Sequence, residues 1–106
     1  MVIILIRRFV RPDREPEFLA TYRAQTPFKK PACKGEKLTR IGDAAAIPPG
    51  LRGIALSGPG CVTYLNIAKW DSWVSFAKQF PLADTFDPKI ETAPRQRAVL
   101  DVIEDP

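Results

Sequence analysis

One polar side chain interrupts the most apolar strand pattern of the chain. The stretch from Cys61 to Lys69 alternates as a strand does, which places Asn66 on one face with Tyr64 and Trp70. An amide there could bind a substrate carbonyl or orient dioxygen, or it could be a structural amide bonded to a loop carbonyl. Trp70 could stack on an aromatic substrate or fill the core at a strand–helix corner. We therefore take Asn66 and Trp70 as candidate catalytic residues.

Tyrosine and arginine side chains could complete a pocket beside them. Tyr64 and Tyr22 could each supply a phenol, although a core tyrosine whose hydroxyl reaches solvent is the common alternative. Arg7 or Arg8 could bind an anionic substrate group, with pairing to the acidic residues near the last strand as the structural alternative.

Other kinds of catalytic site find no support in the composition. The chain has no histidine, which is the commonest general base and metal ligand. Cys33 and Cys61 lack the C-x-x-C spacing of redox and zinc sites. No phosphate-binding loop or metal-ligand spacing is visible. We expect no metal and no cofactor.

Charge and hydropathy limit the partners. The net charge of +4 comes from 16 basic and 12 acidic residues, which is too mild and too scattered for a nucleic-acid interface. The apolar N-terminal run ends at Arg7 after six residues, too short for a signal peptide or a membrane span. We expect a cytoplasmic protein that binds neither nucleic acid nor membrane.

Strand and helix patterns alternate along the chain. β-branched runs and period-2 alternation indicate the strands, and apolar residues at helical spacing behind capping residues indicate the helices. The predicted elements are a strand over Val2–Val10, a helix from an Asp13 N-cap to about Gln25, an edge strand over Lys34–Ile41, a strand over Cys61–Lys69, a helix begun by Asp71 or Ser72 and ended by Pro81, a short helix over Lys89–Ala93 and a strand over Arg97–Ile103.

Residues 42–60 form a separate Gly/Pro-rich segment with turn signals at Pro48–Gly50 and Gly58–Gly60. It is either a long loop or a hairpin with a short strand over Leu51–Leu56. A lid, an arm toward a second subunit and a passive extension all remain open as its role.

The element order predicts a single domain over residues 1–106, with α+β, ferredoxin-like architecture. Its two helices would cover one face of an antiparallel sheet. The other face would carry Leu65 and Ile67, which need a cover, and a second copy of the sheet would supply it. We therefore expect a homodimer.

Three stretches resemble the dimeric α/β-barrel superfamily, in particular its antibiotic-biosynthesis-monooxygenase-like members. RRFVRPDREPEF is similar to the opening strand and helix, KGEKL to the second strand, and LNIAKWDSWVSFAKQF to the third strand and second helix. The resemblance covers residues 2–42 and 61–80, and residues 42–60 have no counterpart in it. It implies a homodimeric α/β barrel.

The resemblance also implies site residues. In the cofactor-independent, quinone-forming branch, an asparagine and a tryptophan four residues apart line the pocket, and Asn66 and Trp70 match them. Phe76 stands where that branch has a tyrosine. The haem-degrading branch needs a histidine that this chain lacks, and its first-strand pocket asparagine falls near Arg7. The implied substrate pocket consists of Tyr64, Tyr22, Arg7 and Phe76 around Asn66 and Trp70.

Two functions follow and remain open. The first is a cofactor-independent monooxygenase-like enzyme that acts on a small aromatic or phenolic substrate between sheet and helices. The second is a non-catalytic, small-molecule-binding or stress-associated dimer on the same scaffold. The absent hydroxyl at Phe76 favours the second, and the Asn66–Trp70 pair favours the first.

Overall fold

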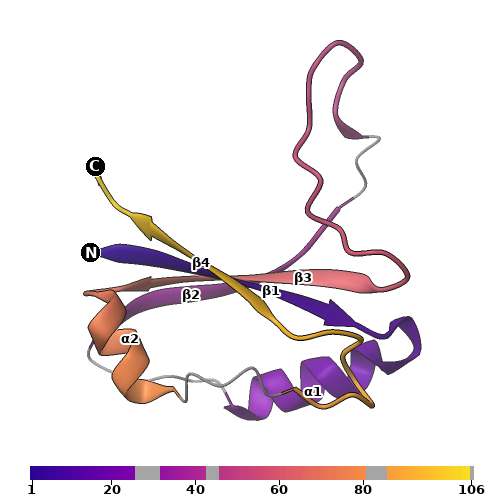
Figure 1. Cartoon of the computed structure of the whole chain (residues 1–106), viewed down its shortest axis with the longest axis horizontal. Helices are drawn as coiled ribbons and strands as arrows, with labels where there is room; N and C mark the ends of the chain where they lie inside the picture. The colour runs from indigo at the N-terminus through magenta and orange to yellow at the C-terminus, as the bar shows by residue number, and fades with distance from the viewer. Residues whose placement is uncertain (26–31, 43–45, 81–85, 106) are drawn as a thin grey trace.

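The computed structural model describes residues 1–25, 32–42, 46–80 and 86–105, which form a small α+β domain (Figure 1). The four predicted strands are confirmed, each to within two residues at either end. The elements are β1 (Val2–Val10), a 3-10 turn η1 (Pro12–Arg14), α1 (Glu15–Gln25), β2 (Cys33–Arg40), β3 (Val62–Trp70), α2 (Trp73–Gln79) and β4 (Gln96–Asp101).

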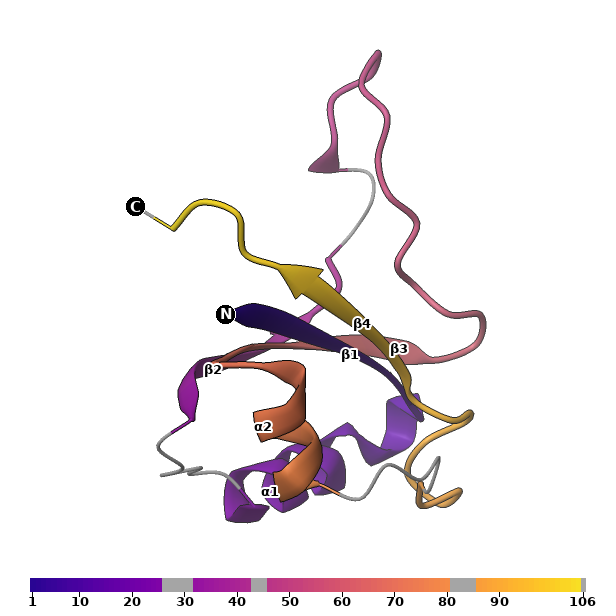
Figure 2. The same cartoon turned by 60° about the vertical axis from the view of Figure 1, so that its left-hand side comes forward.

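The four strands form one antiparallel sheet in the order β2-β3-β1-β4. The apolar strands β1 and β3 are central, and the charged strand β2 lies at an edge as predicted, because an edge leaves charged side chains in solvent. Both helices lie on the same side of the sheet (Figures 1 and 2). This arrangement is compatible with a ferredoxin-like fold.

Local hydrogen bonds explain where the helices begin. Ser72 caps α2, since the backbone amide of Ser75 donates to Ser72 Oγ at 3.1 Å. The predicted Asp13 N-cap of α1 is wrong. Asp13 lies inside η1, which the amide of Arg14 closes by donating to the Arg11 carbonyl at 2.9 Å. The chain thus enters α1 through a tighter turn.

The predicted short helix over Lys89–Ala93 is also wrong. Asp87 does start a turn, because its carboxylate accepts from the amide of Lys89 at 2.9 Å. After one turn, however, Glu91 pairs with Val10 in an antiparallel bridge, and the chain bends at residues 92–93 before it enters β4. Pairing with the end of β1 satisfies the backbone groups that a helix would otherwise have used.

The described part of the Gly/Pro-rich segment, residues 46–60, is a long loop and contains no strand, so of the two alternatives the structure shows the loop and not the hairpin with a strand over Leu51–Leu56. We call residues 46–60 the arm. It rises from the side of the sheet opposite to the helices (Figures 1 and 2).

Two hydrophobic clusters fill the space between the sheet and the helices. The α2 cluster is built around Trp70, Ile4 and Phe76, and the α1 cluster around Val10, Phe18 and Tyr64. Val2 and Ala68 complete the buried part of the α2 cluster. The core is therefore divided into two parts along the strands.

The opposite face of the sheet, which we call the outer face, carries alternate residues of the same strands. Leu5 and Arg7 pair there with Ile67 and Leu65, which are half-buried. Neither helix covers this face (Figure 2). None of the described helices is long and apolar enough to cross a membrane.

Candidate functional site

Four polar residues lie on the helix side of the sheet, where the two clusters meet. We call Arg8, Tyr22, Glu36 and Asn66 the polar seam. Strand alternation places Asn66 between Tyr64 of the α1 cluster and the small Ala68 of the α2 cluster. The two hydrophobic clusters therefore meet at these polar residues.

Asn66 is the most buried member, with 2% of its surface exposed. Its Nδ2 donates to Glu36 Oε1 at 3.2 Å. Its Oδ1 is buried and has no hydrogen-bond partner among the described residues. Leaving such an acceptor unpaired costs about 1–3 kcal/mol, so a donor from a bound molecule would be stabilised there.

Glu36 is half-buried on β2, on the same face as Asn66. Burial raises the pKa of its carboxyl group above the ordinary value. Hydrogen bonds with Asn66 and Tyr22 and the positive charge of Arg8 act in the opposite direction and are outweighed. A carboxylate with a raised pKa is a stronger base than an ordinary one.

Tyr22 approaches the same carboxylate from α1. Burial and the nearby charge of Glu36 raise the pKa of the Tyr22 hydroxyl to about 12. The phenol therefore stays protonated at neutral pH and can act as a hydrogen-bond donor.

Arg8 supplies the positive charge of the seam. Its guanidinium lies over the Phe18 ring, 4.7 Å from the ring centroid, and its Nε is 3.4 Å from Glu91 Oε1. Glu91 is itself buried and also binds Arg95, with 2.9 Å between Arg95 Nη2 and Glu91 Oε2. Two guanidinium groups around one carboxylate leave a net positive charge beside the seam.

Trp70 and Phe76 lie away from the seam, in the α2 cluster. Trp70 is 1% exposed, and the Phe76 ring meets it edge-on at 5.5 Å between centroids. Phe80 meets it in the same way at 6.0 Å. The indole thus packs against aromatic side chains of the chain itself.

The other two predicted pocket residues also have partners within the chain. Tyr64 is 4% exposed and donates to Glu15 Oε1 at 2.7 Å, and burial together with Glu15 raises its pKa to about 12. Arg7 lies on the outer face, where its Nε donates to Gln96 Oε1 at 3.0 Å. Alternation along β1 therefore places Arg8, rather than Arg7, on the same face of the sheet as Asn66.

Of the seam residues, Asn66 and Tyr22 were predicted from the sequence, with Arg8 as the alternative to Arg7. Glu36 was not predicted, because a charged residue on an edge strand suggested a solvated position. Alternation along the strand could have identified Glu36, because it puts Glu36 on the same face as the apolar Leu38.

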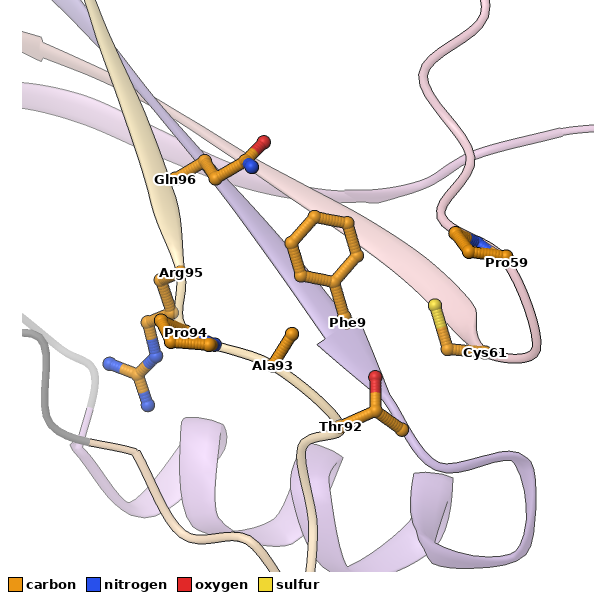
Figure 3. A pocket seen from close by; sticks show the side chains of 8 residues that line it. All are labelled: Phe9, Pro59, Cys61, Thr92, Ala93, Pro94, Arg95 and Gln96. Atoms are coloured by element: carbon orange, nitrogen blue, oxygen red, sulfur yellow. The ribbon is translucent and has the colours of Figure 1, made fainter.

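A separate surface hollow of about 580 Å³ lies near the far end of β1 (Figure 3). Phe9 is at its centre, and none of the predicted site residues lines it. Across the part of the chain that the structure describes, no three side chains of the metal-binding kind gather in one place. The lining residues of the hollow are Phe9, Pro59, Cys61, Thr92, Ala93, Pro94, Arg95 and Gln96.

No protein-family model matches this chain, and no curated protein matches it at a significant level.

Proposed function

We propose that the polar seam is the binding site of a cofactor-independent, monooxygenase-like enzyme for a small phenolic substrate. The observation that carries the proposal is the buried, unpartnered Oδ1 of Asn66 beside a carboxylate of raised pKa. An orphaned acceptor calls for a donor, and a phenolic hydroxyl is one. The carbonyl or dioxygen contact predicted for Asn66 would use an N–H of its amide, and Glu36 accepts one of the two that the amide carries.

Three of the four seam residues have a role in this reaction. Asn66 Oδ1 accepts the hydrogen bond of the substrate hydroxyl and orients the ring. Glu36 removes a proton, and its raised pKa brings it nearer to neutral pH than an ordinary carboxylate. The positive charge of Arg8 stabilises the anion that forms.

The electron-rich anion then reduces dioxygen directly. An activated CH₂ carbon loses its two hydrogens and gains one oxygen atom as a quinone-type carbonyl. The second oxygen atom leaves as water with those two hydrogens, so the atoms and electrons balance. The chain supplies the base, the orientation and the positive charge for this step.

We also propose that the chain forms a homodimer through the outer face, as in a dimeric α/β barrel. The half-buried Leu5, Leu65 and Ile67 support this, because a contiguous apolar sheet face is usually covered. Sedimentation at micromolar concentration tests it, and a monomer there refutes it.

A second candidate function is non-catalytic binding of the same class of small molecule. The packing of Trp70 against Phe76 and Phe80 favours it, because the indole is engaged within the core and is not presented to a ligand. In this case the seam binds the phenol and no oxygen is consumed.

Oxygen uptake with anthrone, which carries an activated CH₂ carbon, separates the two functions. The enzyme consumes one dioxygen per substrate, and Asn66→Ala lowers the rate at least tenfold. Ser75→Ala is the matched control, because it removes a polar group of α2 whose contact is with Ser72. Unchanged uptake in Asn66→Ala refutes the catalytic role, and calorimetric binding without uptake supports the second function.

A further inference from the structure

The arm presents aliphatic side chains to solvent. Ile47, Leu51 and Ile54 are exposed by 40%, 67% and 84%. Arg52 is the only charged residue between positions 46 and 60. Large aliphatic side chains gathered on an almost uncharged projection are typical of an interaction surface.

The arm has a defined shape despite its lack of strands. The amide of Leu51 donates to the Pro48 carbonyl at 3.2 Å, which closes a turn at the tip. Gly53 lies against Ile47, since a Cβ atom at Gly53 would come within 2.8 Å of Ile47 Cδ1. The two limbs of the arm therefore touch each other.

The base of the arm is fixed to the outer face. Arg7 Nη1 donates to the Leu56 carbonyl at 3.2 Å, and the amide of Gly58 donates to Thr63 Oγ1 at 2.8 Å. A Cβ atom at Gly58 would lie 2.5 Å from the Phe9 ring, so only glycine fits this contact. These contacts hold the arm on the side of the sheet away from the helices (Figure 2).

This position excludes one of the three roles that the sequence leaves open. A lid on the polar seam would have to lie on the helix side, and the arm projects from the other side (Figures 1 and 2). The arm therefore projects in the direction from which a second sheet would approach the outer face.

The outer face is of modest size for a dimer interface. Four strands of six to nine residues, spaced about 4.8 Å apart, present roughly 500 Å² of flat projected area. A standard stable interface buries about 800 Å² of accessible surface on each partner. The arm carries exposed aliphatic side chains on the same side of the sheet and would add to this contact.

We infer that the arm of each copy packs against a second copy of this chain and clasps the dimer formed through the outer face. This inference rests on the proposed homodimer and is independent of the proposed catalysis. In a two-fold dimer each arm would contact the partner in the same way, so the contribution of the arm counts twice.

Sedimentation equilibrium over a dilution series tests the inference. The double variant Leu51→Asp/Ile54→Asp places two charges on the arm at positions that are exposed within one copy. Val74→Asp, at a position 58% exposed on α2, is the control. We expect the dissociation constant of the dimer to rise on the order of a hundredfold in the arm variant and to stay unchanged in the control.

The outcomes separate the two proposals. If the wild type is a dimer and the arm variant has the same dissociation constant, the clasp is refuted and the homodimer proposal is retained. A wild-type monomer overturns both. Far-ultraviolet circular dichroism shows whether the arm variant keeps its fold, and the milder Leu51→Ser/Ile54→Ser variant repeats the measurement if it does not. Oxygen uptake is measured separately, because its result tests neither the clasp nor the homodimer.

Discussion

Replacing Glu36 by glutamine should stabilise the protein while impairing its chemistry. Glutamine keeps the shape of the side chain, and its oxygen can still accept the hydrogen bond from Asn66 Nδ2, now 3.2 Å from Glu36 Oε1. The variant loses the charge and exchanges the second carboxylate oxygen for an NH₂ group. Because burial raises the pKa of Glu36, its surroundings as a whole disfavour the charged form.

The sign of the effect depends on pH. The folded protein keeps the Glu36 proton to higher pH than the unfolded chain does, so stability falls as pH rises above the unfolded pKa. Glu36→Gln removes this loss. At pH 7 we expect the free energy of unfolding to increase by about 0.5–2 kcal/mol, the usual size of a single stabilising substitution. Below about pH 4, where the glutamate is protonated in both states, the gain should disappear.

Urea denaturation at the two pH values measures the stability, and oxygen uptake measures the chemistry. Loss of a general base should lower the rate at least a hundredfold. Glu17→Gln is the matched control, since its side chain is 54% exposed and pairs only with Arg14 among the described contacts, so its effect should stay within about 0.5 kcal/mol. A Glu36→Gln variant that is less stable at pH 7 would show that the carboxylate is held by favourable charges, and the reasoning would be wrong.

Two further predictions concern buried polar groups. Glu91→Ala should lower the free energy of unfolding by about 3–5 kcal/mol, because the side chain is 3% exposed and compensates two guanidinium groups. Thermal denaturation should show a fall of at least about 12 °C, and a fall below about 4 °C would contradict the ion-pair argument. Tyr22 and Tyr64, the two tyrosines of the chain, should both ionise near pH 12, with stability falling as pH rises from about 10 toward 12. Tyrosinate absorbance checks this, and a transition near pH 10 in the folded protein would refute it.

The strands were predictable because their signal is local and strong. β-branched residues at period 2 gave Val2–Val10 without error, and the charges of β2 correctly indicated an edge. The helix over Lys89–Ala93 failed because the deciding interaction, the bridge between Val10 and Glu91, joins residues far apart in the sequence. The hydrogen bond between the Asp87 carboxylate and the Lys89 amide can begin a single turn as well as a longer helix.

The candidate site was predictable only in part for the same reason. A polar residue in an apolar strand pointed to Asn66. Alternation along β1 puts Arg7 and Arg8 on opposite faces. Strand register, which is not visible in the sequence, decides that Glu36 reaches Asn66. Periodicity thus indicates which face a residue occupies, and pairing between strands determines its neighbours.

The division of the core has a consequence for how the domain opens. β1 and β3 run through both clusters, whereas α2, only seven residues long, packs against one of them. Opening of α2 can therefore expose the α2 cluster without breaking the sheet, and amide hydrogens of α2 should exchange with solvent before those of β1 and β3. The seam lies at the boundary of that opening. Under the proposed function, such local opening would give a small molecule access to Asn66, which is 2% exposed in the closed structure.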